Sequence, residues 1–375
     1  MKNRIGIVGG GQLGRMLAFE AKRLGFYVTV IDPTPGSPAG QVVDRQIVAD
    51  FTDEEAIRKL AGLSDYMTFE IELANASLLD ELTKQGVSIN PSAQTLFIIK
   101  DKLKQKKFLK RLKIPTALFR VVENQKNIEQ AAYTFGYPLM LKARFDGYDG
   151  RGNAVISSKK DIAGAFQKLS GRKLYVEKWV SFKKELAVMV ARSIRGEIVT
   201  YPVVETIHRN NICHLVIAPA QISNDISFKA RNLAEKTMRH LQGAGVFGIE
   251  MFLTDKNDVL INEIAPRVHN SGHYTIESCM TNQFEQHIRA ITHLPLGKTE
   301  LVVPCTVMIN ILGERVGQAK LKGLHKALRL EGVSIHIYNK IETKVDRKMG
   351  HITAHAHTAE DALQLAQKAR SYISI

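Results

Sequence analysis

The chain has 375 residues and a formal net charge of +15; 45% of its residues are hydrophobic and 24% are charged. This composition predicts a globular protein of two or three domains, and no apolar stretch is long enough to cross a membrane. The three cysteines are too few and too widely spaced to support a disulfide framework or a zinc site, so we expect a cytoplasmic protein.

The first hundred residues alternate between strand-like and helix-like segments. An apolar strand at 4–8 precedes a helix at 12–24 and a second strand at 27–31. Weaker units follow, with helices at 53–60 and 77–85 and strands near 66–69 and 87–89. This order predicts a parallel sheet with helices on both faces.

A glycine motif follows the first strand. Residues 9–14, Gly-Gly-Gly-Gln-Leu-Gly, match G-x-G-x-x-G and open the helix, and Asp32 ends the second strand, where an acid would meet an adenine ribose. A phosphorylated substrate would use the same glycines and the same helix N-terminus as a dinucleotide. Nothing downstream resembles a hydride-transfer site, which argues against the dinucleotide.

Two acids, Glu70 and Glu72, alternate at the end of the strand predicted near 66–69. They lie either on a solvent-facing edge or, at the carboxyl end of a parallel strand, in a ligand crevice.

A basic run follows at residues 100–113, with Lys100, Lys102, Lys104, Lys106, Lys107, Lys110, Arg111 and Lys113. Such a run suits nucleic acid, or it forms a solvated helix whose apolar face holds Leu103, Phe108, Leu109 and Leu112. No aromatic-rich surface for base stacking accompanies the charge. We therefore favour the helix and expect no nucleic-acid partner.

From residue 113 the pattern becomes α+β, with strands at 139–142, 153–156, 174–180, 185–191 and 199–202. The glycine-rich segment 145–152 lies between two of these strands. Its backbone N–H groups, Arg151 and the preceding Lys142 would suit a triphosphate, although a plain hairpin loop has the same composition. Glu177, Glu185 and His208 would hold an adenine and its ribose, or belong to an ordinary sheet.

Strands at 246–253 and 259–264 predict a hairpin around the turn 255–258. In that register Glu250 lies opposite Glu263, and Phe252 opposite Ile261. Like charges directly opposite each other destabilise a sheet, and a cation between them would remove the cost. Carboxylates together with Asn262 suit Mg²⁺; alternatively, both acids point into water.

The segment 263–273 follows the hairpin and is dense in polar donors. We interpret it as a pocket for a small oxyanion, with Arg267 for a bidentate grip and His269 and Asn270 for orientation. The last eighty residues predict strands at 302–311, 334–338 and 350–356 and a helix at 359–369.

Together these segments resemble the ATP-grasp superfamily and, within it, the 5-(carboxyamino)imidazole ribonucleotide synthetases. The similarity covers 9–15, 69–72, 147–152, 177–180, 262–273 and 347–351, of which the last two are the most specific. It implies an ATP-grasp fold that combines α/β and α+β parts. We expect a Rossmann-like parallel-sheet domain at 1–112, an ATP-grasp domain at 113–295 and a small β-rich domain at 296–375.

The resemblance implies a set of ligand contacts. ATP would contact Lys102, Lys142, Gly147, Tyr148, Asp149, Gly150, Arg151, Gly152, Asn153, Glu177, Lys178, Trp179, Val180, Glu185, His208, Asn262 and Glu263. Glu250 and Glu263 would hold Mg²⁺, in agreement with the hairpin argument. Aminoimidazole ribonucleotide would contact Gln12, Leu13, Asp32, Glu70, Tyr148 and His273, with its phosphate near Arg347 and Lys348.

The implied reaction is an ATP-dependent ligation in purine synthesis. Bicarbonate, held by Arg267, His269 and Asn270, would attack the γ-phosphate to give carboxyphosphate, while Arg151 and Lys348 stabilise the transferred group. Carboxyphosphate would yield CO₂, which the exocyclic amine captures. Glu70 and Tyr148 complete the expected catalytic set. The family also implies a homodimer whose product passes to a mutase, with no nucleic-acid or membrane partner.

The sequence departs from the family pattern at Lys102, Asp146, Val268 and Asn339, where arginine, glycine, proline and glycine are usual. Two alternatives stay open. One is a related ATP-grasp enzyme that activates formate for glycinamide ribonucleotide, against which the segment 347–351 argues. The other is an NAD-dependent dehydrogenase or a nucleotide-binding module.

Overall fold

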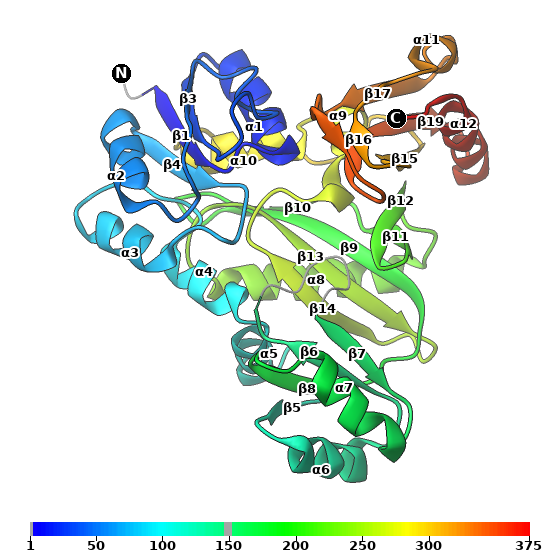
Figure 1. The fold of residues 1–375 in the computed structure, drawn as a ribbon. Helices are drawn as coiled ribbons and strands as arrows, with labels where there is room; N and C mark the ends of the chain where they lie inside the picture. The colour runs from blue at the N-terminus through cyan, green and yellow to red at the C-terminus, as the bar shows by residue number, and fades with distance from the viewer. Residues whose placement is uncertain (1–2, 146–151) are drawn as a thin grey trace.

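The computed structural model describes residues 3–145 and 152–375. Asp146 and the expected ligand contacts Gly147, Tyr148, Asp149, Gly150 and Arg151 lie outside the described residues. In Figure 1 the N-terminal elements lie at the upper left, the C-terminal elements at the upper right and a small sheet at the bottom. The C-terminal strands belong to the large central sheet. In the described part, no helix has both the length and the apolar character needed to cross a bilayer.

The N-terminal sheet is parallel, with the strand order β3-β2-β1-β4. Its elements are β1 (Arg4–Val8), α1 (Gln12–Arg23), β2 (Tyr27–Ile31), β3 (Arg45–Ile47), α2 (Glu54–Leu63), β4 (Tyr66–Phe69) and α3 (Ala76–Lys84). Strands β1, β2 and β4 confirm the predictions residue for residue. The strand predicted at 87–89 is wrong, because only an isolated bridge joins Ile89 to Met67 there.

The basic run is divided between two helices, α4 (Ala93–Lys100) and α5 (Lys102–Arg111). Asp101 separates them, and its side chain caps α5 by accepting hydrogen bonds from the N–H groups of Leu103 and Lys104. The predicted apolar face is confirmed, with Leu103, Phe108 and Leu109 buried. The expectation of a fully solvated basic face is wrong for Lys106, which is 2% exposed.

The small sheet is antiparallel, with the order β5-β8-β6-β7. Its strands are β5 (Phe119–Val122), β6 (Leu139–Ala143), β7 (Asn153–Ile156) and β8 (Leu174–Lys178). Helices α6 (Gln125–Phe135) and α7 (Ile162–Lys168), with the short η1 (Lys159–Asp161), pack against it around a core of its own. Figure 1 shows this unit at the bottom of the molecule.

The central sheet follows the order β14-β13-β9-β11-β12-β15-β19-β17, with β10 paired to β9. Its strands are β9 (Phe182–Arg192), β10 (Ile198–Thr200), β11 (Val204–Arg209), β12 (Ile212–Ala218), β13 (Gly245–Thr254), β14 (Val259–Ala265), β15 (Cys305–Leu312), β17 (Val333–Ile337) and β19 (Lys348–Ala356). Pairing of β12 with β15 makes the sheet continuous across residue 295. The domain boundaries themselves stay a prediction.

The remaining elements cover or flank the central sheet. They are α8 (Asn224–His240), η2 (Asn270–Gly272), α9 (Thr275–Ser278), α10 (Gln283–Ile291), β16 (Gly317–Gln318), α11 (Leu324–Ala327), β18 (Glu342–Thr343) and α12 (Ala359–Tyr372). The central strand β9 is buried on both faces, which explains its unbroken apolar run. Ala187 and Met189 face the core that contains α10 and α1, whereas Leu186 and Val188 face the core that contains α8 and α5.

One buried histidine joins the N-terminal sheet to the central sheet. The Nδ1 atom of His287 accepts a hydrogen bond from the Val246 N–H at 3.0 Å, so its Nε2–H faces the Thr68 hydroxyl at 2.8 Å. Burial lowers the pKa of His287 to about 3, and the ring therefore stays neutral near pH 7.

We predict that His287→Leu lowers the free energy of unfolding by about 2–4 kcal/mol, because two buried polar groups lose their partner. Urea unfolding followed by circular dichroism measures the change. The control is His240→Leu at the exposed end of α8, which should cost less than about 0.5 kcal/mol. Equal losses in the two variants would contradict the proposed link.

Candidate functional site

The hairpin of β13 and β14 brings Glu250 and Glu263 together, as predicted. The outer register differs from the prediction, because Phe252 pairs with Leu260 and Ile261 pairs with Met251. Asn257 adopts a left-handed conformation (φ 64°), and the turn is one residue longer than expected. A bulge beside Glu250 then restores the acidic pair and leaves Asn262 as the extra residue.

The negative charges of the two carboxylates are neutralised to different extents. The Lys102 ammonium lies 2.6 Å from Glu263 Oε2. Burial raises the pKa of Glu263, but the charge and hydrogen bond of Lys102, together with the charges of Lys142 and Lys106, hold this pKa below the ordinary value. Burial and the neighbouring Glu263 charge raise the pKa of Glu250. In the described ranges no lysine or arginine pairs with Glu250.

His269 does not supply the missing positive charge. Its Nε2 atom lies 3.7 Å from Glu250 Oε1. Burial, assisted by the charges of Arg267 and Lys348, lowers the pKa of His269 well below its usual value, so the ring is neutral near pH 7. The acidic pair therefore keeps an excess of negative charge at the Glu250 end.

Gln105 fixes α5 against the hairpin. Its side-chain N–H donates to the Ile264 carbonyl at 3.2 Å, and its Oε1 accepts from the Ile264 N–H at 3.0 Å. Asp101, which caps the same helix, also binds the guanidinium of Arg144 at the end of β6. These contacts set Lys102 across from Glu263. Gln105 could not be predicted as a contact of the hairpin, since a glutamine within a lysine run has no recognisable pattern.

A second charge cluster surrounds Glu177 on β8. Lys106 lies 2.9 Å from one carboxylate oxygen, and Lys142 lies 2.7 Å from the other. Burial opposes ionisation, but the two ammonium groups outweigh it and lower the pKa of Glu177 to about 2. Lys106 also donates to the Thr116 hydroxyl at 2.9 Å. The cluster confirms that Glu177 and Lys142 lie together, and it adds Lys106, which was expected to be solvated.

The other expected ATP contacts lie at nearby strand ends. The His208 ring on β11 pairs with Glu185 on β9, and this pair raises the pKa of His208 in spite of burial. Lys178 ends β8, and Trp179 and Val180 follow it. Gly152 precedes β7, whose first residue, Asn153, pairs with Lys142. The charges of Lys142 and Lys106 act on Glu263, and the charge of His208 acts on Glu250. The cluster around Glu177 and the acidic pair of the hairpin therefore form one electrostatic network.

The glycine motif is filled by the protein's own carboxylates. The Gly10 N–H donates to Asp32 at 2.9 Å, while the N–H groups of Gly11 and Gly14 donate to Glu70 at 2.5 and 3.0 Å. A Cβ at Gly11 would lie 2.7 Å from Glu70 Oε1, which explains the need for glycine there. The anion at the start of α1 is therefore Glu70, and the dinucleotide interpretation loses its phosphate site.

Two other residues of the expected substrate side lie on the same helix. Leu13 is 7% exposed and packs into the core, so only its backbone is placed to meet a ligand. Gln12 at the start of α1 is half-buried.

The expected oxyanion pocket is only partly exposed. Arg267 Nε lies 3.2 Å from Glu72 Oε1, and its guanidinium also donates to the Val268 carbonyl. The amide of Asn270 is buried and exchanges two hydrogen bonds with Asn310, at 2.7 and 3.0 Å. His273 is fully buried, with Nδ1 facing the Gln283 amide. Asn270 and His273 thus support the loop from behind, and Arg267 and His269 are the more accessible pair.

Arg347 and Lys348 lie at the start of β19. Arg347 is exposed, and its guanidinium donates to the Glu342 carbonyl at 2.7 Å. Lys348 is half-buried, and its carbonyl accepts a hydrogen bond from the Lys340 ammonium at 2.8 Å. The charges of Arg347, Lys348 and Glu70 all act on Lys340. That Arg347 and Lys348 contact the substrate phosphate stays a prediction.

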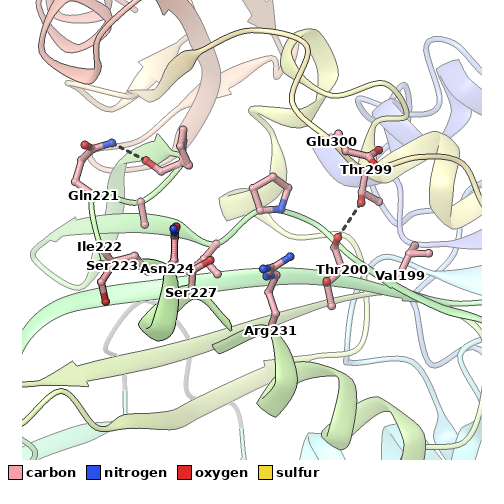
Figure 2. A pocket seen from close by; sticks show the side chains of 14 residues that line it. Val199, Thr200, Gln221, Ile222, Ser223, Asn224, Ser227, Arg231, Thr299 and Glu300 are labelled. Atoms are coloured by element: carbon pink, nitrogen blue, oxygen red, sulfur yellow. Dashed lines mark hydrogen bonds between the residues drawn. The ribbon is translucent and has the colours of Figure 1, made fainter. Parts of the chain in front are cut away.

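A separate groove of about 1040 Å³ lies beside the N-terminus of α8. Figure 2 shows Arg231 and Ser227 on that helix facing Thr200 across the groove. None of the predicted site residues that the structure describes lines it. The groove and the charge network are therefore separate places on the protein.

We predict that Lys106→Met lowers the free energy of unfolding by about 3 kcal/mol, because it leaves part of the buried Glu177 charge uncompensated. Lys104→Met is the matched control on the same helix, where the side chain is exposed, and it should cost less than about 0.5 kcal/mol. Chemical denaturation of both variants provides the measurement. Indistinguishable midpoints would show that Lys106 does not compensate Glu177.

Three family models match successive parts of the chain. They describe a ribonucleotide synthetase preATP-grasp domain at residues 1–100, an ATP-grasp domain at 107–284 and a phosphoribosylaminoimidazole carboxylase C-terminal domain at 306–365. Four fungal phosphoribosylaminoimidazole carboxylases, including that of Ogataea methanolica, are 44–45% identical to this chain over the matched residues. The chain spans 62–67% of their length.

Relatives of similar length also match. N5-carboxyaminoimidazole ribonucleotide synthase from Bacillus subtilis is 44% identical over 93% of this chain and 90% of its own. The crystal structure of N5-carboxyaminoimidazole ribonucleotide synthetase from Thermotoga maritima has a TM-score of 0.90 and 48% identity, over 100% of this chain and 99% of that one. The chain belongs to the N5-carboxyaminoimidazole ribonucleotide synthase family of ATP-grasp ligases.

Proposed function

We propose that this protein catalyses the ATP-dependent carboxylation of aminoimidazole ribonucleotide in purine biosynthesis. The observation that carries the proposal is the charge network around Glu250 and Glu263, which joins two acids to Lys102, Lys106 and Lys142. A structural relative from Aspergillus clavatus, with a TM-score of 0.91 and 40% identity, is described in complex with ADP and aminoimidazole ribonucleotide. Both of its ligands carry phosphate groups, which the lysines of this network could bind.

The residues present fit a magnesium ion. No lysine or arginine among the described residues forms an ion pair with Glu250, and Lys102 supplies only one positive charge at Glu263. The ion would be held by Glu250, Glu263 and the bulged Asn262. The described residues contain no group of three or more acidic, histidine or cysteine side chains suited to a metal. Phosphate oxygens and water would therefore supply the remaining ligands. When bound, the ion neutralises charge on the phosphates of ATP.

The lysines of the network are placed to receive the phosphates. Lys142 and Lys102 are 17% and 20% exposed and end on carboxylates, so each has an ammonium already oriented toward the site. A triphosphate would compete with Glu177 and Glu263 for these ammonium groups. Positioning and charge neutralisation of this kind account for most catalysis in phosphoryl transfer.

The carboxylation step assigns roles to Arg267 and His269. Attack of a bicarbonate oxygen on the γ-phosphorus would break its bond to the bridging oxygen and release ADP with carboxyphosphate. Arg267, oriented by Glu72, would hold the bicarbonate anion, and neutral His269 would donate a hydrogen bond without repelling Arg267. Carboxyphosphate would then split into CO₂ and phosphate, and the amine would attack CO₂ and lose a proton.

The cytoplasmic location, the homodimer and the transfer of the product to a mutase stay predictions that rest on the family resemblance.

ADP release tests the reaction directly. With Mg-ATP, we expect turnover with bicarbonate and aminoimidazole ribonucleotide and none with formate and glycinamide ribonucleotide. The reverse pattern would favour the formate-activating alternative. Mg-ATP should also raise the melting temperature while NADH leaves it unchanged, because Glu70 and Asp32 occupy the amides that a dinucleotide needs.

We predict that Glu263→Gln reduces ATP turnover by about 100-fold or more while the far-UV circular dichroism is unchanged, because the ion loses half of its carboxylate charge. Asp255→Asn, in the exposed turn of the same hairpin, is the matched control and should retain wild-type turnover. Turnover in the Glu263 variant within a few fold of wild type would refute the metal assignment.

A further inference from the structure

Two lysines share the Glu177 carboxylate, but they differ in how deeply they are buried. Lys142 lies on β6 opposite Tyr175 of β8, so Glu177, two residues further along β8, faces the same side of the small sheet. The Lys142 side chain is 17% exposed, whereas the Lys106 side chain is 2% exposed. The ammonium of Lys142 is therefore the more accessible of the two to a ligand from solvent.

A second contact anchors Lys106 to the central sheet. Its ammonium donates to the Thr116 hydroxyl at 2.9 Å, and that hydroxyl donates to the Ile261 carbonyl on β14 at 2.8 Å. The Ile261 N–H in turn donates to the Pro115 carbonyl at 2.9 Å. Lys106 thus lies between the two sheets, with an anchored partner on each. We expect Lys142, and not Lys106, to change partner when a ligand binds.

The burial of Glu177 limits what Lys142 can do alone. The Glu177 side chain is 4% exposed. Burial raises the pKa of Glu177, but the charges of Lys106 and Lys142 outweigh this effect and lower the pKa to about 2. A buried charge that loses its only partner is strongly destabilising. One lysine must therefore stay at Glu177 if the other is to leave for a ligand.

We propose that Lys106 is a positioning residue for nucleotide binding, which keeps the Glu177 charge compensated and so allows Lys142 to leave this carboxylate for a phosphate of ATP. The inference rests on the proposed function for ATP as the ligand, but not for the identity of the molecule that is carboxylated. Without Lys106, Lys142 would be the sole counter-ion of a buried carboxylate, and a phosphate would have to break that pair. Lys106 thus acts through Glu177 and contacts no ligand itself.

Calorimetric titration with ADP, without a second substrate, tests the proposal. We expect the Kd to rise about tenfold in Lys106→Met, because the phosphates lose a charge-assisted contact with Lys142. In the Glu177→Gln background the same substitution should change the Kd less than about twofold, since no carboxylate then retains Lys142. Lys104→Met, which removes an exposed lysine of the same helix, should match wild type.

Two further measurements separate positioning from a general effect on the structure. Adenosine has no phosphate, so its inhibition constant should change less than about twofold in Lys106→Met. The KM for ATP should rise in this variant, while the KM for aminoimidazole ribonucleotide should change less than about twofold. Lys106→Gln, which is also uncharged but keeps a donor for Thr116, should show the same pattern and serves as the test if Lys106→Met does not fold.

Three results would overturn the proposal. The first is an unchanged Kd for ADP in the folded Lys106 variants, and the second is an equal loss of affinity in the Glu177→Gln background. The third is an equal loss for ADP and adenosine, which would indicate a general structural role. If wild type bound no ADP, the proposed function would fail and this inference with it, whereas ADP binding that is indifferent to Lys106 would refute this inference alone.

Discussion

Two carboxylates that share one register position in the β13–β14 hairpin impose the main constraint on this structure. Directly opposed like charges destabilise a sheet, and the partial burial of Glu250, whose side chain is 26% exposed, increases the cost. Lys102 offsets the charge of Glu263, whereas burial and Glu263 keep the pKa of Glu250 raised. The protein therefore holds an incompletely neutralised acidic pair, an arrangement that a divalent ion would complete.

Contacts in the surrounding fold fix the positions of Lys102 and Glu263. Gln105 ties α5 to both backbone groups of Ile264, next to Glu263, and Asp101 ties the start of the same helix to the end of β6. Buried ion pairs such as Lys106–Glu177 stabilise a fold little compared with apolar packing, so their presence calls for another reason. Lysines held by carboxylates near a nucleotide site present oriented positive charge to an incoming triphosphate.

Local patterns in the sequence predict much of this fold. Strands β1, β2, β4 and β7 match their predicted limits, because each is a short apolar or alternating run between turn-forming residues. The pairing of Glu250 with Glu263 in the hairpin also follows from the alternation of side chains between the two faces of each strand. The register beyond it does not, since Asn257 lengthens the turn and the bulge at Asn262 compensates, and neither feature has a firm signal in sequence.

Long-range contacts account for the errors. Glu70 fills the amides of the glycine motif from 56–59 positions away, so the motif alone could not distinguish an internal carboxylate from a bound phosphate. Lys106 was expected to be solvated because its partner Glu177 lies on strand β8, far away in the sequence. Asn270 and His273 are buried and pair with Asn310 and Gln283, which the sequence did not indicate; their contacts with a ligand stay a prediction. Such pairs depend on tertiary contacts that a single sequence does not reveal.

The most direct test of the central claim is a crystal of the protein soaked with Mn²⁺ and a non-hydrolysable ATP analogue, examined by anomalous scattering. The account predicts a metal peak between the carboxylates of Glu250 and Glu263, with the phosphates close to Lys142 and Lys102. A metal bound elsewhere would contradict the account. So would an ordered nucleotide whose phosphates lie away from Glu250 and Glu263, with these two side chains separated and solvated.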